Sequence, residues 1–168
     1  MSSLDRRRVL AFAGLASLGA ALAGCGFAPA LGPQGPARGL TGAINAADPT
    51  DKNGFDLVER LEERLGRPDA PRFDLTYTIR TTSVGVGVTP ENAITRFNLE
   101  GTVDWALTNR STGIRETGGT VRSFTAWFAT GSTVAGLAAQ EDAALRLMRI
   151  LADQITARLI ATSGAWAK

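Results

Sequence analysis

The stretch Arg96–Thr108, RFNLEGTVDWALT, alternates apolar and polar side chains more regularly than any other part of the chain. Its apolar positions would share one face of an extended strand: Phe97, Leu99, Val103, Trp105 and Leu107. Its polar positions would share the other: Arg96, Asn98, Glu100, Thr102, Asp104 and Thr108. A period of two residues predicts a strand with one face in a core and the other face open.

The segments on either side of this strand supply two antiparallel neighbours. Asn109–Gly113 is a short polar loop that ends in glycine, as hairpin loops do, and a further strand is predicted over Ile114–Phe128. Gly118-Gly119 indicates a bulge or bend within it. On the other side, Phe73–Arg80 also alternates, and Val84–Val88 extends it loosely.

Two amphipathic helices are predicted outside these strands. The longer runs from about Thr133 to Ala161, and Thr162–Lys168 is expected to be a frayed tail. Its apolar stripe consists of Ala144, Leu147, Met148, Leu151, Ile155 and Leu159. The shorter helix is capped by Asp51 or Asn53 and ended by Gly66 and Pro68. Its expected apolar stripe is Phe55, Val58, Leu61 and Leu65.

A weak strand over Leu40–Ala46 completes the order β-α-β-β-β-α. A helix between the first two strands predicts a parallel crossover pair, and the short later turns predict antiparallel hairpins. The fold class is therefore α+β, with two helices packed on one face of a four-stranded mixed sheet and the other face open. One domain, residues 40–161, holds these elements.

Three aromatic residues end the last predicted strand: Phe124, Trp127 and Phe128. We expect at least two of them in the core. The alternative is that they meet a partner at the strand end.

The N-terminus has the features of an export signal. Arg6-Arg7-Arg8 precedes Val9–Leu22, an uncharged run too short for a membrane-spanning helix, which needs roughly 20 residues. Residues 1–24 are therefore predicted to be a signal peptide. The arginines are compatible with either the general or the twin-arginine export route.

The only cysteine, Cys25, lies directly after this run. Leu22-Ala23-Gly24-Cys25 resembles the bacterial lipobox, in which the cysteine sulfur receives a diacylglycerol and the chain is cut before it. Gly26 in place of Asp resembles lipoproteins released to the outer membrane. Residues 25–39, rich in proline and glycine, are predicted to be an extended tether.

The charge and the catalytic inventory exclude several classes of protein. The whole chain has 18 Lys and Arg residues and 16 Asp and Glu residues. Residues 1–24 contain three of the arginines and Asp5, so the mature chain has no net charge. A neutral chain lacks the excess of positive charge with which proteins bind nucleic acid.

The chain has no histidine, so imidazole-based catalysis and His-ligated metals are excluded. Glu100 and Asp104 would lie roughly 13 Å apart, too far for paired acid–base work. We expect no enzymatic activity, no catalytic residue, no metal site and no cofactor.

The polar face of the sheet raises one functional question. It is expected to carry Arg80, Arg96, Arg110, Arg115 and Arg122. Arginine suits phosphate oxygens through its bidentate fork, so this face could contact an anionic lipid. The alternative is an ordinary solvated face, balanced by Asp74, Glu100, Asp104 and Glu116.

Three segments in this order resemble the lipopolysaccharide-assembly lipoprotein family, LptE. They are CGFAPALG at residues 25–32, RFNLEGTVDWALTNRSTGIRETGGTVRSFTAWF at residues 96–128, and DAALRLMRILADQITARL at residues 142–159. The resemblance implies a plug and chaperone subunit of the outer-membrane barrel LptD, lipid-anchored at the periplasmic face of the outer membrane. It also implies contacts with lipopolysaccharide, which match Arg80, Arg96 and Arg122. A lipid-anchored accessory or scaffold subunit of another envelope or transport complex is the alternative.

Lipidation of Cys25 gives the first prediction. Cells that make the wild-type protein are expected to incorporate radiolabelled palmitate into it, and the Cys25→Ser variant is expected to incorporate none, because serine has no sulfur for the thioether. The measurement is autoradiography of the purified protein. An unlabelled wild-type protein with its leader still attached would contradict the lipobox interpretation.

Overall fold

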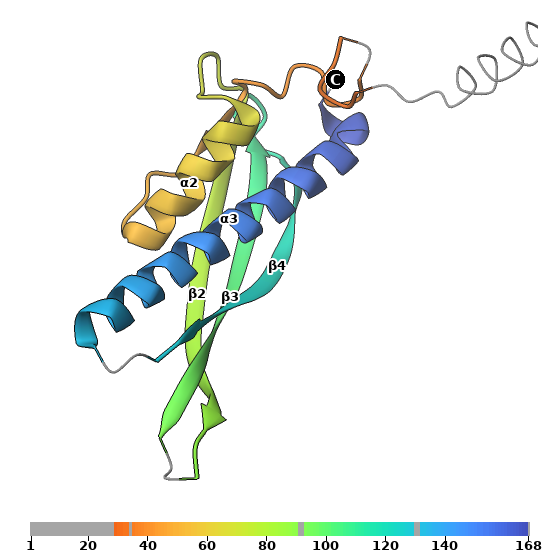
Figure 1. Ribbon diagram of the computed structural model, residues 1–168. Coiled ribbons are helices and arrows are strands. Elements are labelled where there is room, and N and C mark those ends of the chain that lie inside the picture. The colour runs from red at the N-terminus through yellow and green to blue at the C-terminus, as the bar shows by residue number, and fades with distance from the viewer. Residues whose placement is uncertain (1–28, 34, 91–92, 130–131, 168) are drawn as a thin grey trace, which may run out of the picture.

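The computed structural model describes residues 29–33, 35–90, 93–129 and 132–167, so the predicted signal peptide and Cys25 lie outside the described residues. Two helices cover one face of a four-stranded sheet (Figure 1). The elements in chain order are β1 (Ile44–Ala46), α2 (Lys52–Leu65), β2 (Phe73–Val88), β3 (Ile94–Asn109), β4 (Arg115–Phe128) and α3 (Thr133–Trp166). The predicted α+β fold and its β-α-β-β-β-α order are confirmed.

The sheet has the order β1-β2-β3-β4. β1 pairs parallel with β2, and the β2–β3 and β3–β4 pairs are antiparallel, as predicted. β1 is shorter than the predicted strand over Leu40–Ala46. The residues before it form turns, in which Gly39 and Gly42 have φ values of 83° and 71°, a region that favours glycine.

The regular alternation of β3 places its apolar side chains under α3. Leu99, Val103, Trp105 and Leu107 are all buried. Gly101 lies in the same row and lets the helix approach closely, since a Cβ there would lie 2.8 Å from Leu147 Cδ2 and 3.0 Å from Leu151 Cδ1. The facing stripe of α3 is fully buried at Leu147, Met148, Leu151, Ile155 and Leu159.

The shorter helix, α2, is turned differently from the prediction. Its cap is Asp51, whose side chain accepts a hydrogen bond from Gly54 N at 2.7 Å. Phe55 is 57% exposed, and the buried apolar positions are Leu57, Leu61 and Leu65. The expected stripe was wrong at Phe55 because Gly54, and not Phe55, faces the sheet at the start of the helix. A Cβ on Gly54 would lie 3.3 Å from Tyr77 Oη, so no large side chain fits there.

The described ends of the chain differ from the predicted tether and frayed tail. α3 continues to Trp166, whose ring meets Phe73 edge-on at 5.2 Å between centroids, and this contact orders the tail. Residues 29–33 and 35–39 form successive turns, and Ala37 is fully buried. The described part of the tether is therefore folded against the domain, beside the end of α3 (Figure 1).

The aromatic end of β4 also differs from expectation. Trp127 is buried and stacks on Phe97 at 5.1 Å between ring centroids. Phe124 and Phe128 are 61% and 68% exposed, so the placement of at least two of the three in the core was wrong. Their even-numbered positions face away from the helices. The irregularity in β4 lies opposite Leu107 and Thr108, slightly before the Gly118-Gly119 pair where it was expected.

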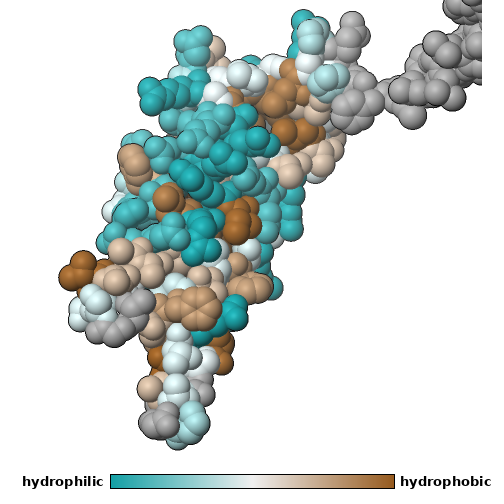
Figure 2. Space-filling model, viewed as in Figure 1, coloured by the Kyte–Doolittle hydropathy of each residue, from teal (hydrophilic) through white to brown (hydrophobic). Residues whose placement is uncertain are grey.

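The helix side of the molecule is polar at its centre and apolar toward both ends. Figure 2 shows hydrophilic side chains over the middle of this face, and apolar ones at the end where α3 begins and at the end where it finishes. Val134 and Leu137, in the first turns of α3, are 78% and 58% exposed. No helix among the described residues is both long and apolar enough to span a membrane.

The packing of α3 on β3 predicts unequal effects for two adjacent residues. Leu151→Ala is expected to lower the free energy of unfolding by about 2–5 kcal/mol, because it leaves a cavity in a fully buried site. Ile150→Ala is the matched control. Its side chain is 38% exposed, so a loss of under about 1 kcal/mol is expected. Urea denaturation of both variants measures the difference, and equal losses would contradict this packing.

Candidate functional site

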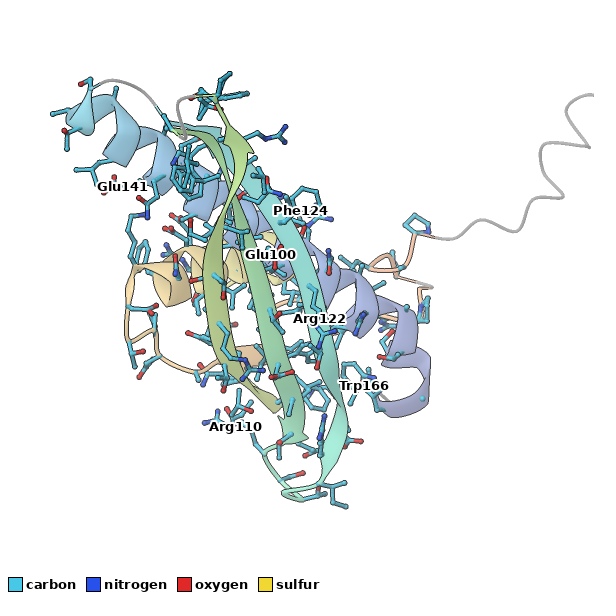
Figure 3. The ribbon with its side chains drawn as sticks, turned by 90° about the horizontal axis from the view of Figure 1, so that it is seen from below. Glu100, Arg110, Arg122, Phe124, Glu141 and Trp166 are labelled. Atoms are coloured by element: carbon cyan, nitrogen blue, oxygen red, sulfur yellow. The ribbon has the colours of Figure 1, made fainter. Side chains whose placement is uncertain are left out.

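The candidate site is the face of the sheet that the helices leave open. Figure 3 looks onto this face with both helices behind it, and Glu100, Arg110, Arg122 and Phe124 are labelled there. The register aligns Arg80, Thr102 and Arg122 in one row across β2, β3 and β4. Neighbouring strands lie roughly 4.8 Å apart, so the two arginines extend from backbones roughly 10 Å apart.

Asp104 lies next to this row and forms an ion pair with Arg80. Its carboxylate accepts hydrogen bonds from the hydroxyl of Thr120 and from the guanidinium of Arg80. The Thr120 hydrogen bond contributes most to lowering the pKa of Asp104 below its ordinary value, followed by Arg80, and the charge of Arg122 adds to the effect. The carboxylate is thus held ionised and fixes Arg80 on the open face.

The three arginines predicted to contact lipopolysaccharide are all exposed, but they do not form one cluster. Arg80 is paired with Asp104. Arg122 makes no ion pair within the described residues, so its guanidinium is available to an anion. The guanidinium of Arg96 lies over the ring of Phe128, 5.9 Å from its centroid, and Phe128 is six positions along β4 from Arg122. The structure therefore brings Arg80 and Arg122 together and leaves Arg96 roughly 20 Å away.

The acidic residues predicted to balance this face do so only in part. Asp74 accepts from Arg110 Nε at 3.1 Å, and Asp104 binds Arg80. Glu116 instead accepts from the amide of Asn109, at 3.1 Å. The side chain of Glu100 makes no hydrogen bond or ion pair within the described residues. The face therefore has two ion pairs, and Arg96, Arg115 and Arg122 make none within the described residues.

A shallow hollow of about 340 Å³ lies beside the Arg80–Arg122 row. Ala106, whose side chain is short, lines it on β3. Gly118, the facing residue on β4, lies under the guanidinium of Arg115, which a Cβ at that position would overlap. The polar side chains around it are Thr76, Thr78, Asp104, Arg115 and Thr120. We did not predict this hollow, although a small residue, Ala106, between larger ones on the polar face of β3 is a signal that the sequence contains.

No group of three or more His, Cys, Asp or Glu side chains is placed to hold a metal ion in the part of the chain that the structure describes. What this face offers is guanidinium and hydroxyl groups on a rigid sheet. Such groups bind anionic and hydroxylated ligands by charge-assisted and neutral hydrogen bonds.

Residues 41–159 match the protein family LptE, described as lipopolysaccharide-assembly. The chain belongs to the LptE family. The match covers all the strands and α2 completely, and most of α3. A comparison with curated proteins finds no match.

Solved structures share the fold of this LptE-family protein. A candidate lipoprotein from Caulobacter crescentus is 22% identical with a TM-score of 0.61, and the alignment covers 73% of this chain and 91% of that one. Rare lipoprotein B from Shewanella oneidensis is 15% identical with a TM-score of 0.55, over 71% and 93% of the two chains. Lipoprotein B from Nitrosomonas europaea is 12% identical with a TM-score of 0.52, over 73% and 84%.

The lowered pKa of Asp104 gives a prediction about pH. Its charged form is favoured in the folded state, so its contribution to stability is present above the unfolded pKa of about 4 and is lost as the pH falls through the lower folded value. Asp104→Asn is expected to melt below wild type at pH 7, and the difference is expected to shrink below about pH 4.

Thermal melts from pH 2 to pH 7 measure this difference. Glu100→Gln is the matched control on the same strand face, since Glu100 makes no ion pair within the described residues. A difference between wild type and Asp104→Asn that stays constant down to pH 2 would show that the charge of Asp104 has no role.

Proposed function

We propose that this protein is a subunit of the machinery that delivers lipopolysaccharide to the cell surface, acting as plug and assembly chaperone of the outer-membrane barrel LptD. The observation that carries the proposal is the LptE-family match over nearly the whole folded domain. Membership of that family supports a role as an outer-membrane lipoprotein of lipopolysaccharide assembly. The specific partner and the mode of action are the proposed part.

The anchor in this proposal is a lipid on Cys25, which holds the protein at the periplasmic face of the outer membrane. Two or more acyl chains give stable membrane attachment, which one chain does not. The described part of the chain begins only a few residues later, at Pro29, and residues 29–33 and 35–39 fold against the domain. A short connection of this kind would hold the domain close to the membrane surface.

The proposed contact with lipopolysaccharide is the Arg80–Arg122 row and the hollow beside it. Arg122 has an unpaired guanidinium, and the hollow is bordered by hydroxyl groups, a combination that suits a phosphorylated saccharide. The mature chain has 15 basic and 15 acidic residues, so its net charge provides no general attraction for an anion. Binding would therefore depend on this local arrangement.

Affinity purification of the tagged protein from outer membranes tests the partner. Co-purification of a barrel of the LptD class, identified by mass spectrometry, is the expected result. Recovery of an inner-membrane transporter without the barrel would support a scaffold subunit of another complex and contradict the proposal. Depletion of the protein is expected to reduce surface lipopolysaccharide, which the scaffold alternative does not predict.

Substitution of Arg122 tests the lipopolysaccharide contact. Arg122→Ala is expected to weaken binding of purified lipopolysaccharide by about tenfold, the order expected for one lost charge-assisted contact. Arg149→Ala, which removes an exposed arginine from α3, is the matched control and is expected to leave binding unchanged. Equal binding by wild type and both variants would exclude the Arg80–Arg122 row as the contact.

A further inference from the structure

The two long edges of the sheet differ in how much of their backbone is hydrogen-bonded to other parts of the chain. Along β4, three side chains of α3 donate hydrogen bonds to carbonyl oxygens of the edge. Arg146 reaches Ala126 O at 3.3 Å, Gln154 reaches Arg122 O at 3.3 Å, and Arg158 reaches Thr120 O at 2.7 Å. The length of one helical turn is close to the length of two residues of a strand. Side chains on α3 can therefore reach the outward carbonyl oxygens of alternate β4 residues and cover this edge.

The opposite edge belongs to β2 and is covered only at its start. β1 pairs with β2 at residues 73–75 alone. Phe73 N donates to Ala43 O and Leu75 O accepts from Ala47 N, so the odd-numbered residues of β2 direct their backbone groups toward this edge. The same alternation directs the N–H and C=O groups of Ile79, Thr81, Ser83 and Gly85 outward. No hydrogen bond from elsewhere in the described residues reaches these groups.

This open stretch lacks the features by which proteins prevent strands from pairing at an edge. Ile79–Gly85 contains neither proline nor lysine, and its pairing with β3 is free of bulges up to Gly85. Its single charge, Arg80, is engaged with Asp104 on the open face. An unprotected edge of this kind is a template for β-strand addition, in which main-chain hydrogen bonds supply the affinity.

We propose that the edge Ile79–Gly85 is a docking strand that binds an extended segment of the barrel partner by β-strand addition. The inference rests on the proposed function, which supplies that partner. Only an extended backbone presents donors and acceptors at the spacing of this edge. The residues that border it are Thr81, Thr82, Ser83 and Val84, so the partner segment is uncharged and rich in β-branched residues.

A second copy of this chain fits the edge less well than a segment of another protein. Antiparallel pairing of two copies around Thr81 or Ser83 brings the hairpin tip of one copy toward Tyr77 of the other. The first turn of α2 lies against the Tyr77 side chain, since a Cβ on Gly54 would be 3.3 Å from Tyr77 Oη. A separate segment that ends before Tyr77 avoids this crowding.

Proline at Ser83 tests the docking strand. The Ser83 N–H points to the edge, so Ser83→Pro removes one outward donor and no bond to β3. We expect this variant to melt within a few degrees of wild type and to recover at least fivefold less barrel protein by affinity purification. Ser83→Ala, which keeps the N–H, is the matched control and is expected to recover as much barrel as wild type.

Full recovery of the barrel by a folded Ser83→Pro variant would overturn the docking strand and leave the proposed function intact. Failure of the wild-type protein to recover any barrel would overturn both. Hydrogen exchange on the wild-type complex gives a readout that needs no variant. Slower exchange at Ile79–Gly85 on complex formation, with β4 unchanged, is expected. Unchanged exchange, or protection that grows with concentration in the protein alone, would overturn the proposal, the latter by showing self-association.

Discussion

The fold depends on the contact between α3 and the centre of β3. Gly101 has no side chain, and the ends of Leu147 and Leu151 fill the space where one would be. This close approach lets α3 lie across the sheet, and its fully buried stripe covers the apolar face (Figure 1). Burial of a Leu or Met side chain contributes about 1.5–3 kcal/mol, so this one seam is a large part of the stability of a domain of this size.

The same placement of α3 determines what the sheet leaves available. Once the helix lies along β4, its polar side chains reach the carbonyl oxygens of that edge, and its apolar stripe occupies one face. α2 is joined to α3 through Arg60 and Asp153, whose Nη2 and Oδ2 atoms are 3.0 Å apart, and both helices lie on the same side. The opposite face and the far part of the β2 edge remain for a partner or a ligand.

The open face shows how a nearly neutral surface can still present a local positive group. Asp104 neutralises Arg80 and is itself satisfied by Thr120, whereas Arg122 in the same row has no carboxylate within ion-pair distance in the described residues. Counting charges gives no indication of this, because basic and acidic residues balance. Pairing depends on which side chains the strand register places side by side. Within the described residues it leaves the guanidinium groups of Arg96, Arg115 and Arg122 without a carboxylate partner.

The amino-acid sequence by itself determined the order of the elements, the fold class and which face of β3 is buried, because these depend on residue periodicity alone. It also indicated that Arg80, Arg96 and Arg122 share one face. Only the tertiary structure decided which of them lie together, since that depends on the pairing of residues far apart in the chain. The rotation of α2 that exposes Phe55, the exposure of Phe124 and Phe128, and the ordering of the last turn by Trp166 and Phe73 were decided at the same level. A local sequence pattern indicates that a residue is apolar. It does not indicate how much space is available beside Gly54 or at the end of β4, because that space depends on residues far away in the chain.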